Sequence, residues 1–177
     1  MANYVYIAES LDGFIATPDG GLDWLEDIPN PEGSDYGFAE FISGINALVM
    51  GRKTFEKVLS FGEWPYDRPV YVLSSHDVTA PKHLEEVVET TGGDLHTLVA
   101  RLGKEGLHNL YIDGGVTIQS FLKEDLIDHL IITTIPVLLG DGVPLFGKLP
   151  QSISFNHIKT TIYNDSLVKS YYARQRE

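Results

Sequence analysis

The sequence predicts an α/β fold with a mainly parallel central sheet, helices on both faces and a C-terminal antiparallel hairpin. Short β-branched and aromatic runs alternate along the chain with segments of helical period, which is the pattern of a parallel sheet covered by helices. Near the C-terminus, apolar and polar residues alternate on both sides of the sequence YNDS, as they do in a hairpin. No repeat or linker interrupts the chain, so we expect one domain over residues 1–177.

The first part of the chain alternates strand and helix. Residues 4–8, YVYIA, predict a strand because β-branched and aromatic side chains dominate them. Residues 9–34 predict a long loop, since glycine and proline recur throughout it, and long loops in compact domains are usually functional. Apolar residues at helical spacing after a capping serine or aspartate predict a helix over residues 34–45. Residues 47–50 predict a buried strand, and residues 53–61 return to helix.

The middle of the chain repeats this alternation. Residues 69–75 predict a strand, and residues 84–90 are a candidate for a second, short strand. Residues 94–106 predict an amphipathic helix, because an aspartate stands at the N-cap position and a glycine at the end. Residues 109–113 predict a strand that runs into two glycines, and residues 117–126 predict the helix that follows.

The last part of the chain is rich in strands. Residues 128–140 predict a long strand in which Pro136 marks a bend, and residues 153–175 predict the terminal hairpin. Because parallel strands place their carboxyl ends at one edge of a sheet, and ligands of α/β folds bind at that edge, the segments after these strands are the expected site.

Composition narrows the classes of function. The chain has 177 residues, 43% of them hydrophobic, and a formal net charge of −12, which argues against nucleic acid as a partner. A few local cations can still bind a small anionic ligand. The absence of cysteine favours a cytoplasmic protein, and no signal peptide or membrane-spanning run is expected. The six histidines lack metal-binding spacing, so we predict no metal site.

The segment VMGRKTFE has the features of a phosphate site. Gly51 follows a strand and allows a tight turn, and the next helix presents free N–H groups to an anion. Arg52 and Lys53 add charge, and Thr54 adds a hydroxyl. The alternative is a solvated first helical turn. The segment IDGGVTIQSFL repeats the arrangement and could cradle a pyrophosphate together with GRKT, although Gly-Gly alone is commonly a turn.

The segments VMGRKTFE, VYVLSS and IDGGVTIQSFL, in that order, resemble the motifs of the dihydrofolate reductase superfamily. The segments AESLDGFIAT and PVLLGDGVPLF are more similar to the branch that contains the reductase domain of bacterial riboflavin biosynthesis. The resemblance covers nearly the whole chain. It implies a three-layer dihydrofolate reductase-like fold and an NADPH-dependent reductase of a small heterocyclic, pteridine- or pyrimidine-like substrate.

The resemblance also implies which residues bind NADPH. Arg52 would favour the 2′-phosphate and thus NADPH over NADH, and the Gly114–Gly115 peptide is cis in many relatives. The implied cofactor-binding residues are Ala8, Ile15, Gly51, Arg52, Lys53, Thr54, Leu73, Ser74, Ser75, Gly114, Gly115, Val116, Thr117 and Ile118.

Two carboxylates are candidate catalytic residues by the same resemblance. Asp35 falls where dihydrofolate reductases hold and protonate a pterin, but it is equally suited to cap the following helix. Asp113 stands where the riboflavin branch has an acid near the nicotinamide. Tyr6 replaces a substrate-site lysine of that branch, and its DNP-type segment is not evident, which weakens the pyrimidine assignment. A pteridine, the riboflavin pyrimidine and another metabolite therefore stay open as substrates.

The main alternative is an NADPH-binding regulatory or structural module without catalytic activity. We expect a homodimer, because relatives in the riboflavin branch pair through their sheets and terminal strands. The apolar C-terminal hairpin could be buried within one chain or between two. Trp24 and Trp64 either line a pocket for a flat ring or anchor the core, and Asp12 is expected to hold its turn.

Overall fold

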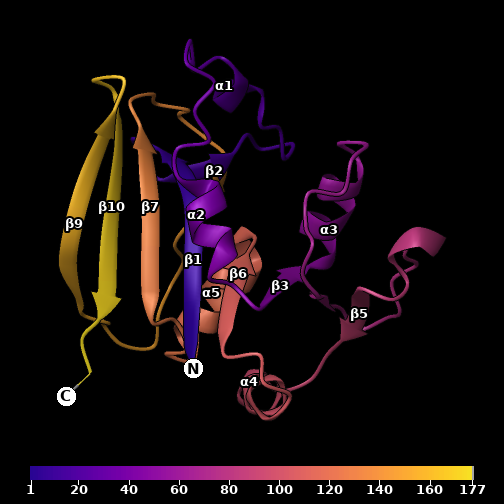
Figure 1. Cartoon of the computed structure of the whole chain (residues 1–177). Coiled ribbons are helices and arrows are strands. Elements are labelled where there is room, and N and C mark those ends of the chain that lie inside the picture. Colours follow the sequence, from indigo (N-terminus) through magenta and orange to yellow (C-terminus); the bar gives the residue numbers. More distant parts are fainter. Residues whose placement is uncertain (177) are drawn as a thin grey trace.

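An eight-stranded sheet forms the centre of the computed structural model, which describes residues 1–176 (Figure 1). Its strands are β1 (Ala2–Ser10), β3 (Ala47–Gly51), β4 (Val70–Leu73), β5 (Val88–Thr91), β6 (Asn109–Asp113), β7 (His129–Ile135), β9 (Phe155–Tyr163) and β10 (Leu167–Arg174). They lie in the order β5-β4-β3-β6-β1-β7-β10-β9. The helices are α1 (Asp23–Glu26), α2 (Phe38–Ser43), α3 (Arg52–Leu59), α4 (Leu95–Lys104) and α5 (Gly115–Lys123), with a 3₁₀ turn at Lys82–Leu84.

The strands pair in parallel from β5 to β7 and antiparallel at the C-terminal edge. Strand β10 runs antiparallel to both β7 and β9. Between β9 and β10, Asn164 and Asp165 both have positive φ, which gives a tight turn whose twist matches that of the strands. The predicted α/β class, with a mainly parallel sheet and a C-terminal hairpin, is confirmed.

Helices cover both faces of the sheet. Because side chains alternate along a strand, Val5 of β1 lies in one core with Leu102 of α4 and Phe121 of α5. Tyr6, the next residue, packs in the other core with Phe55 of α3 and with aromatic side chains of α2. Within residues 1–176, no helix combines the length and the apolar content that crossing a bilayer requires.

The segment predicted as one long loop contains regular structure. Strand β1 continues to Ser10, β2 (Phe14–Ala16) pairs antiparallel with β8 (Val143–Pro144), and α1 forms a single turn. The β2–β8 pair joins residues that are far apart in sequence, so local pattern alone gave no signal for it. This small sheet lies at the carboxyl end of β1, where it brings together the segment that follows β1 and the segment that follows β7 (Figure 1).

Other bounds differ from the prediction for identifiable reasons. Strand β7 ends at Ile135, because Pro136 has no N–H to continue the ladder. The candidate short strand at residues 84–90 is present as β5, but it spans Val88–Thr91. It begins later than predicted because a 3₁₀ turn precedes it. The predicted cap is present: the Thr97 N–H donates to Asp94 Oδ2 at 2.7 Å.

Candidate active site at the carboxyl ends of the strands

The cationic turn after β3 is open to solvent. Gly51 is the N-cap of α3 and supplies no side chain to its first turn, so the helix begins with unsatisfied N–H groups and its positive dipole end. Arg52 and Lys53 are exposed beside these groups. The Arg52 Nε lies 3.7 Å from Glu56 Oε1, an exposed pair of the kind that contributes little to stability. This turn can therefore accept an anion without first breaking a strong contact.

The glycine pair after β6 lies against that turn. Strands β3 and β6 are neighbours, with Met50 opposite Asp113, so their following loops meet. Gly114 has φ +90°, and a Cβ at this position would come within 2.3 Å of Thr54 Oγ1. A Cβ on Gly115 would come within 2.8 Å of Ile15 Cδ1. The two glycines therefore allow three loops to pack closely against one another at this edge of the sheet.

The other predicted cofactor-binding residues occupy the same edge in different ways. Leu73 is opposite Gly51 in the sheet, so Ser74 and Ser75 extend the edge beyond it. Ala8 lies on β1, and Val116 is 76% exposed at the start of α5. Thr117 is buried, and its Oγ1 would be 3.0 Å from a Cβ on Gly51.

Ile118 stands apart from this set. Its side chain is fully buried in the core, and its N–H donates to the Gly114 carbonyl at 2.8 Å. Its contribution to the edge is therefore to hold the Gly114 loop in place. The Gly114–Gly115 peptide is trans.

Asp113 is a carboxyl group that can titrate near neutral pH. It is partly buried at the end of β6, and Oδ1 accepts the Gly114 N–H at 2.9 Å. Burial raises the pKa of Asp113 to about 6, and the hydrogen bond from the Gly114 N–H offsets only part of that rise. Burial, and secondarily the nearby Asp113, also raises the pKa values of Tyr66 and Tyr111. A group with this property is suited to hold and release a proton.

Asp35 has the geometry of a helix cap. It is exposed before α2, its Oδ1 accepts the Gly37 N–H at 2.9 Å, and its Oδ2 accepts the Ala39 N–H at 2.8 Å. These bonds lower the pKa of Asp35, so it stays ionised. Asp12 similarly accepts from Ser10 and from the Leu139 and Gly140 N–H groups, which ties the first loop to the loop after β7.

Trp64 is packed into the core rather than open. The Trp64 ring contacts Phe55 and Tyr66 edge to face, at centroid distances of 5.8 and 5.3 Å. Within residues 1–176, the buried indole N–H groups of Trp24 and Trp64 have no hydrogen-bond partner. Trp64 thus anchors the core beneath α3 and flanks Tyr66.

Sequence reasoning missed a buried lysine beside the site. Lys169 of β10 is 1% exposed, and its ammonium donates to the Tyr36 carbonyl. The hydroxyls of Tyr6 and Tyr163 donate to the same oxygen at 3.0 and 3.1 Å. The signal in the sequence was the alternation of β10, which places position 169 on the same inward face as the buried Leu167.

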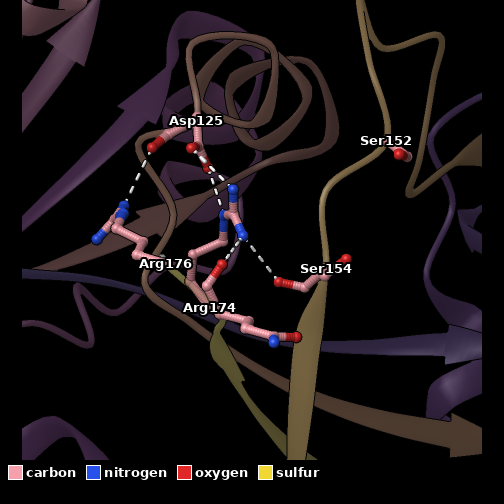
Figure 2. A pocket seen from close by; sticks show the side chains of 6 residues that line it. Asp125, Ser152, Ser154, Arg174 and Arg176 are labelled. Atoms are coloured by element: carbon pink, nitrogen blue, oxygen red, sulfur yellow. Dashed lines mark hydrogen bonds and ion pairs between the residues drawn. The ribbon is translucent and has the colours of Figure 1, made fainter.

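A polar cavity of about 390 Å³ lies at the opposite end of the sheet (Figure 2). Its cations are already paired: Arg174 makes two bonds to Asp125, at 2.6 and 3.0 Å, and Arg176 pairs with Asp128. Arg174 also donates to the Ser154 carbonyl at 3.0 Å. These contacts fix the segment after β10 against the end of the sheet, so we assign this cavity a structural role.

Comparison with known proteins agrees with this architecture. The sequence profile of the family described as "RibD C-terminal domain" matches residues 4–168. The Bacillus subtilis (strain 168) protein YwjB is 37% identical over 174 residues, covering 96% of each chain. The crystal structure of a candidate riboflavin biosynthesis protein from Shewanella sp. PV-4 is 52% identical, covers 99% of this chain and 100% of that chain, and has a TM-score of 0.96.

The fold extends to more distant proteins. A dihydrofolate reductase from Enterococcus faecalis, complexed with NADP(H), is 20% identical, has a TM-score of 0.66, and covers 99% of this chain and 97% of that chain. At that identity the likeness shows the fold alone, and it confirms the predicted dihydrofolate reductase-like architecture.

Proposed function

The chain belongs to the RibD C-terminal domain family, and we propose that it is an NADPH-dependent reductase of a small heterocyclic substrate. One observation carries the proposal: the glycine pair after β6 lies against the cationic turn after β3, with Thr54 directly at Gly114. Two helix N-termini and two exposed cations thereby meet at one edge of the sheet, as binding of a molecule with several phosphates requires.

The residues present fit this cofactor. The α3 and α5 N-termini, whose glycine N-caps contribute no side chain, offer backbone N–H groups to a pyrophosphate. Arg52 offers a planar fork for a further phosphate, which is the group that distinguishes NADPH from NADH. Ala8 and Ile15 lie where backbone contacts to a nicotinamide are expected. The bound cofactor would supply a hydride to a C=N or C=O bond.

We assign the role of proton donor to Asp113 rather than to Asp35. With a pKa of about 6, Asp113 holds a proton for part of the time near neutral pH, so it can donate one to a substrate atom that becomes basic on reduction. Asp35 is ionised, and both of its oxygens are bound to the α2 backbone. Because Tyr6 stands at the position of the family's substrate-site lysine, we favour a pteridine-like substrate over the riboflavin pyrimidine.

We also propose a cytoplasmic homodimer. The lack of cysteine supports the cytoplasmic location, because disulfides are typical of proteins in oxidising compartments. Ile158, Ile162 and Val168 of the hairpin are exposed by 61%, 62% and 38%, and such apolar side chains on one hairpin are suited to burial against a second copy.

Thermal shift and turnover assays test the proposed function. NADPH should raise the melting temperature more than NADH, and NADPH oxidation should depend on an added dihydropteridine or dihydrofolate. The ribosylaminopyrimidine should be turned over more slowly or not at all. Strong NADPH stabilisation without reduction of any carbonyl or imine would favour the non-catalytic module, and the absence of stabilisation by either nucleotide would refute the cofactor assignment.

A further inference from the structure

Lys169 is a buried cation that the proposed hydride transfer does not use. Its side chain is 1% exposed, and within residues 1–176 it forms no ion pair with a carboxylate. Its ammonium lies 5.0 to 5.4 Å from the ring centroids of Tyr6, Tyr163 and Tyr171. A buried charge is costly unless it is compensated, and rings and hydroxyls compensate less than an anion does.

The charge on Lys169 persists at any ordinary pH. Burial alone would lower the pKa of Lys169, but the neighbouring tyrosines outweigh that effect, and the pKa is raised. An ammonium has three donors. One donates to the Tyr36 carbonyl, and Tyr6 Oη lies at 3.5 Å. The group therefore keeps donor capacity for a stronger acceptor.

Lys169 is close to the place expected for the reacting part of the substrate. In the sheet register, Lys169 is opposite Thr133, and Thr133 is opposite Ala8, so the three side chains share one face. Two strand spacings separate Lys169 from Ala8, which is about 10 Å. A heterocycle lying on Ala8 and Thr133 would direct its far end toward the ammonium.

The Tyr36 carbonyl, to which Lys169, Tyr6 and Tyr163 all donate, belongs to an unusual turn. Tyr36 has φ +52°, a left-handed conformation that costs a non-glycine residue energy. The next residue, Gly37, lies directly against the ammonium, since a Cβ there would be only 3.0 Å from Lys169 Nζ. A strained turn thus holds a neutral oxygen where a negatively charged oxygen would bind more strongly.

We propose that Lys169 recognises a carboxylate or phosphate group of the substrate, and that this group displaces the Tyr36 carbonyl from the ammonium. The inference rests on the proposed function and narrows its substrate class to heterocycles with an anionic substituent.

Nuclear magnetic resonance of the lysine ammonium groups tests the proposal with inorganic phosphate as the probe. In the ¹⁵N-lysine protein, the Lys169 signal is identified by its loss in Lys169→Met, or in Lys169→Arg if the methionine variant does not fold. We expect this signal to shift saturably as phosphate is added. Lys159→Met is the matched control, because the Lys159 ammonium also lies over the Tyr171 ring, at 4.4 Å from its centroid, but Lys159 is exposed. The shift of the Lys169 signal should persist in this variant.

The outcomes separate this proposal from the proposed function. A Lys169 signal that stays fixed throughout the titration overturns anion recognition, because a purely structural ammonium would not respond. Failure of NADPH to bind removes the reductase proposal but leaves the phosphate titration readable. A saturable shift that also vanishes in Lys159→Met would assign the anion to the exposed hairpin surface and would equally overturn the proposal.

Discussion

Gly114 and Thr54 are in such close contact that position 114 has no room for a side chain. A Cβ on Gly114 would lie 2.3 Å from Thr54 Oγ1, and the φ of +90° disfavours any other residue. Two loops that are distant in sequence are thereby locked together, and we place the cofactor at the edge of the sheet where they meet.

Gly114→Ala should therefore impair both stability and NADPH binding. The positive φ costs about 1–3 kcal/mol, and overpacking against Thr54 adds about 1–3 kcal/mol more. Gly62→Ala is the matched control, because Gly62 has φ +88° but no neighbour within 4 Å of its Cβ position. Chemical denaturation and NADPH titration measure the two effects. Equal losses of stability in the two variants would contradict the contact.

Arg52→Glu should weaken NADPH binding by about tenfold or more, since a charge-assisted hydrogen bond is worth about 1.5–3 kcal/mol. Binding of NADH should change less, because NADH lacks the 2′-phosphate. Lys57→Glu makes the same change of charge in the last turn of α3, on an exposed side chain, and should leave the preference for NADPH intact. Calorimetry with both nucleotides gives the comparison. An unchanged preference in Arg52→Glu would remove the role assigned to this residue.

The pKa of Asp113 predicts two pH dependences. The folded pKa of about 6 exceeds the ordinary value of 3.8, so between these values the folded state holds more protons than the unfolded state, and stability falls as pH rises through the window. If Asp113 donates a proton, turnover should also fall above pH of about 6. Asp113→Asn should remove the fall in turnover near pH 6 and the part of the stability change that Asp113 contributes; the raised pKa of Glu9 still acts on stability in the same direction. A turnover profile that keeps its limb near pH 6 in the variant would assign the proton to another group.

Substitutions at Asp35 separate a cap from a catalytic group. Asparagine keeps one acceptor oxygen but presents an NH2 group where the other Asp35 oxygen accepts a backbone N–H, so Asp35→Asn should lose part of the cap and keep turnover. Asp35→Ala should lower the melting temperature by about 2–4 °C through loss of the whole cap. Turnover that collapses in Asp35→Asn but persists in Asp35→Ala would contradict a purely structural cap, and turnover that collapses in both folded variants would make Asp35 catalytic.

The exposed hairpin predicts the oligomeric state. Ile162→Asp should convert the proposed dimer to a monomer, because a charge would be buried in an apolar interface. Phe61→Asp also replaces an exposed apolar side chain, at 58% exposure, but lies beyond α3, so it should leave the dimer unchanged. Light scattering measures the mass. A monomeric wild type, or a dimer that survives Ile162→Asp, would contradict this interface.

Sequence pattern sufficed where interactions are local. The strand before Gly51, the Asp94 cap and the YNDS turn each depend on a few neighbouring residues, and each lies where the pattern indicated. Motif order also predicted that the Gly114 loop would meet the GRKT turn, since both follow strands of one parallel sheet.

Long-range packing was beyond the reach of the sequence. The pairing of β2 with β8 and the bonds from Tyr163 and Lys169 to the Tyr36 carbonyl join residues more than 100 positions apart. No local period records such contacts. The choice between a capping role and a catalytic role for Asp35 likewise depended on which groups its two oxygens contact, and only the folded structure gives these contacts.

A crystal of the protein soaked with NADPH tests the central claim most directly. We predict density for the pyrophosphate between the N-termini of α3 and α5, the 2′-phosphate at Arg52 and the nicotinamide near Ala8. A nucleotide bound elsewhere on the molecule, or a fully soaked crystal with no nucleotide at this edge of the sheet, would contradict the account.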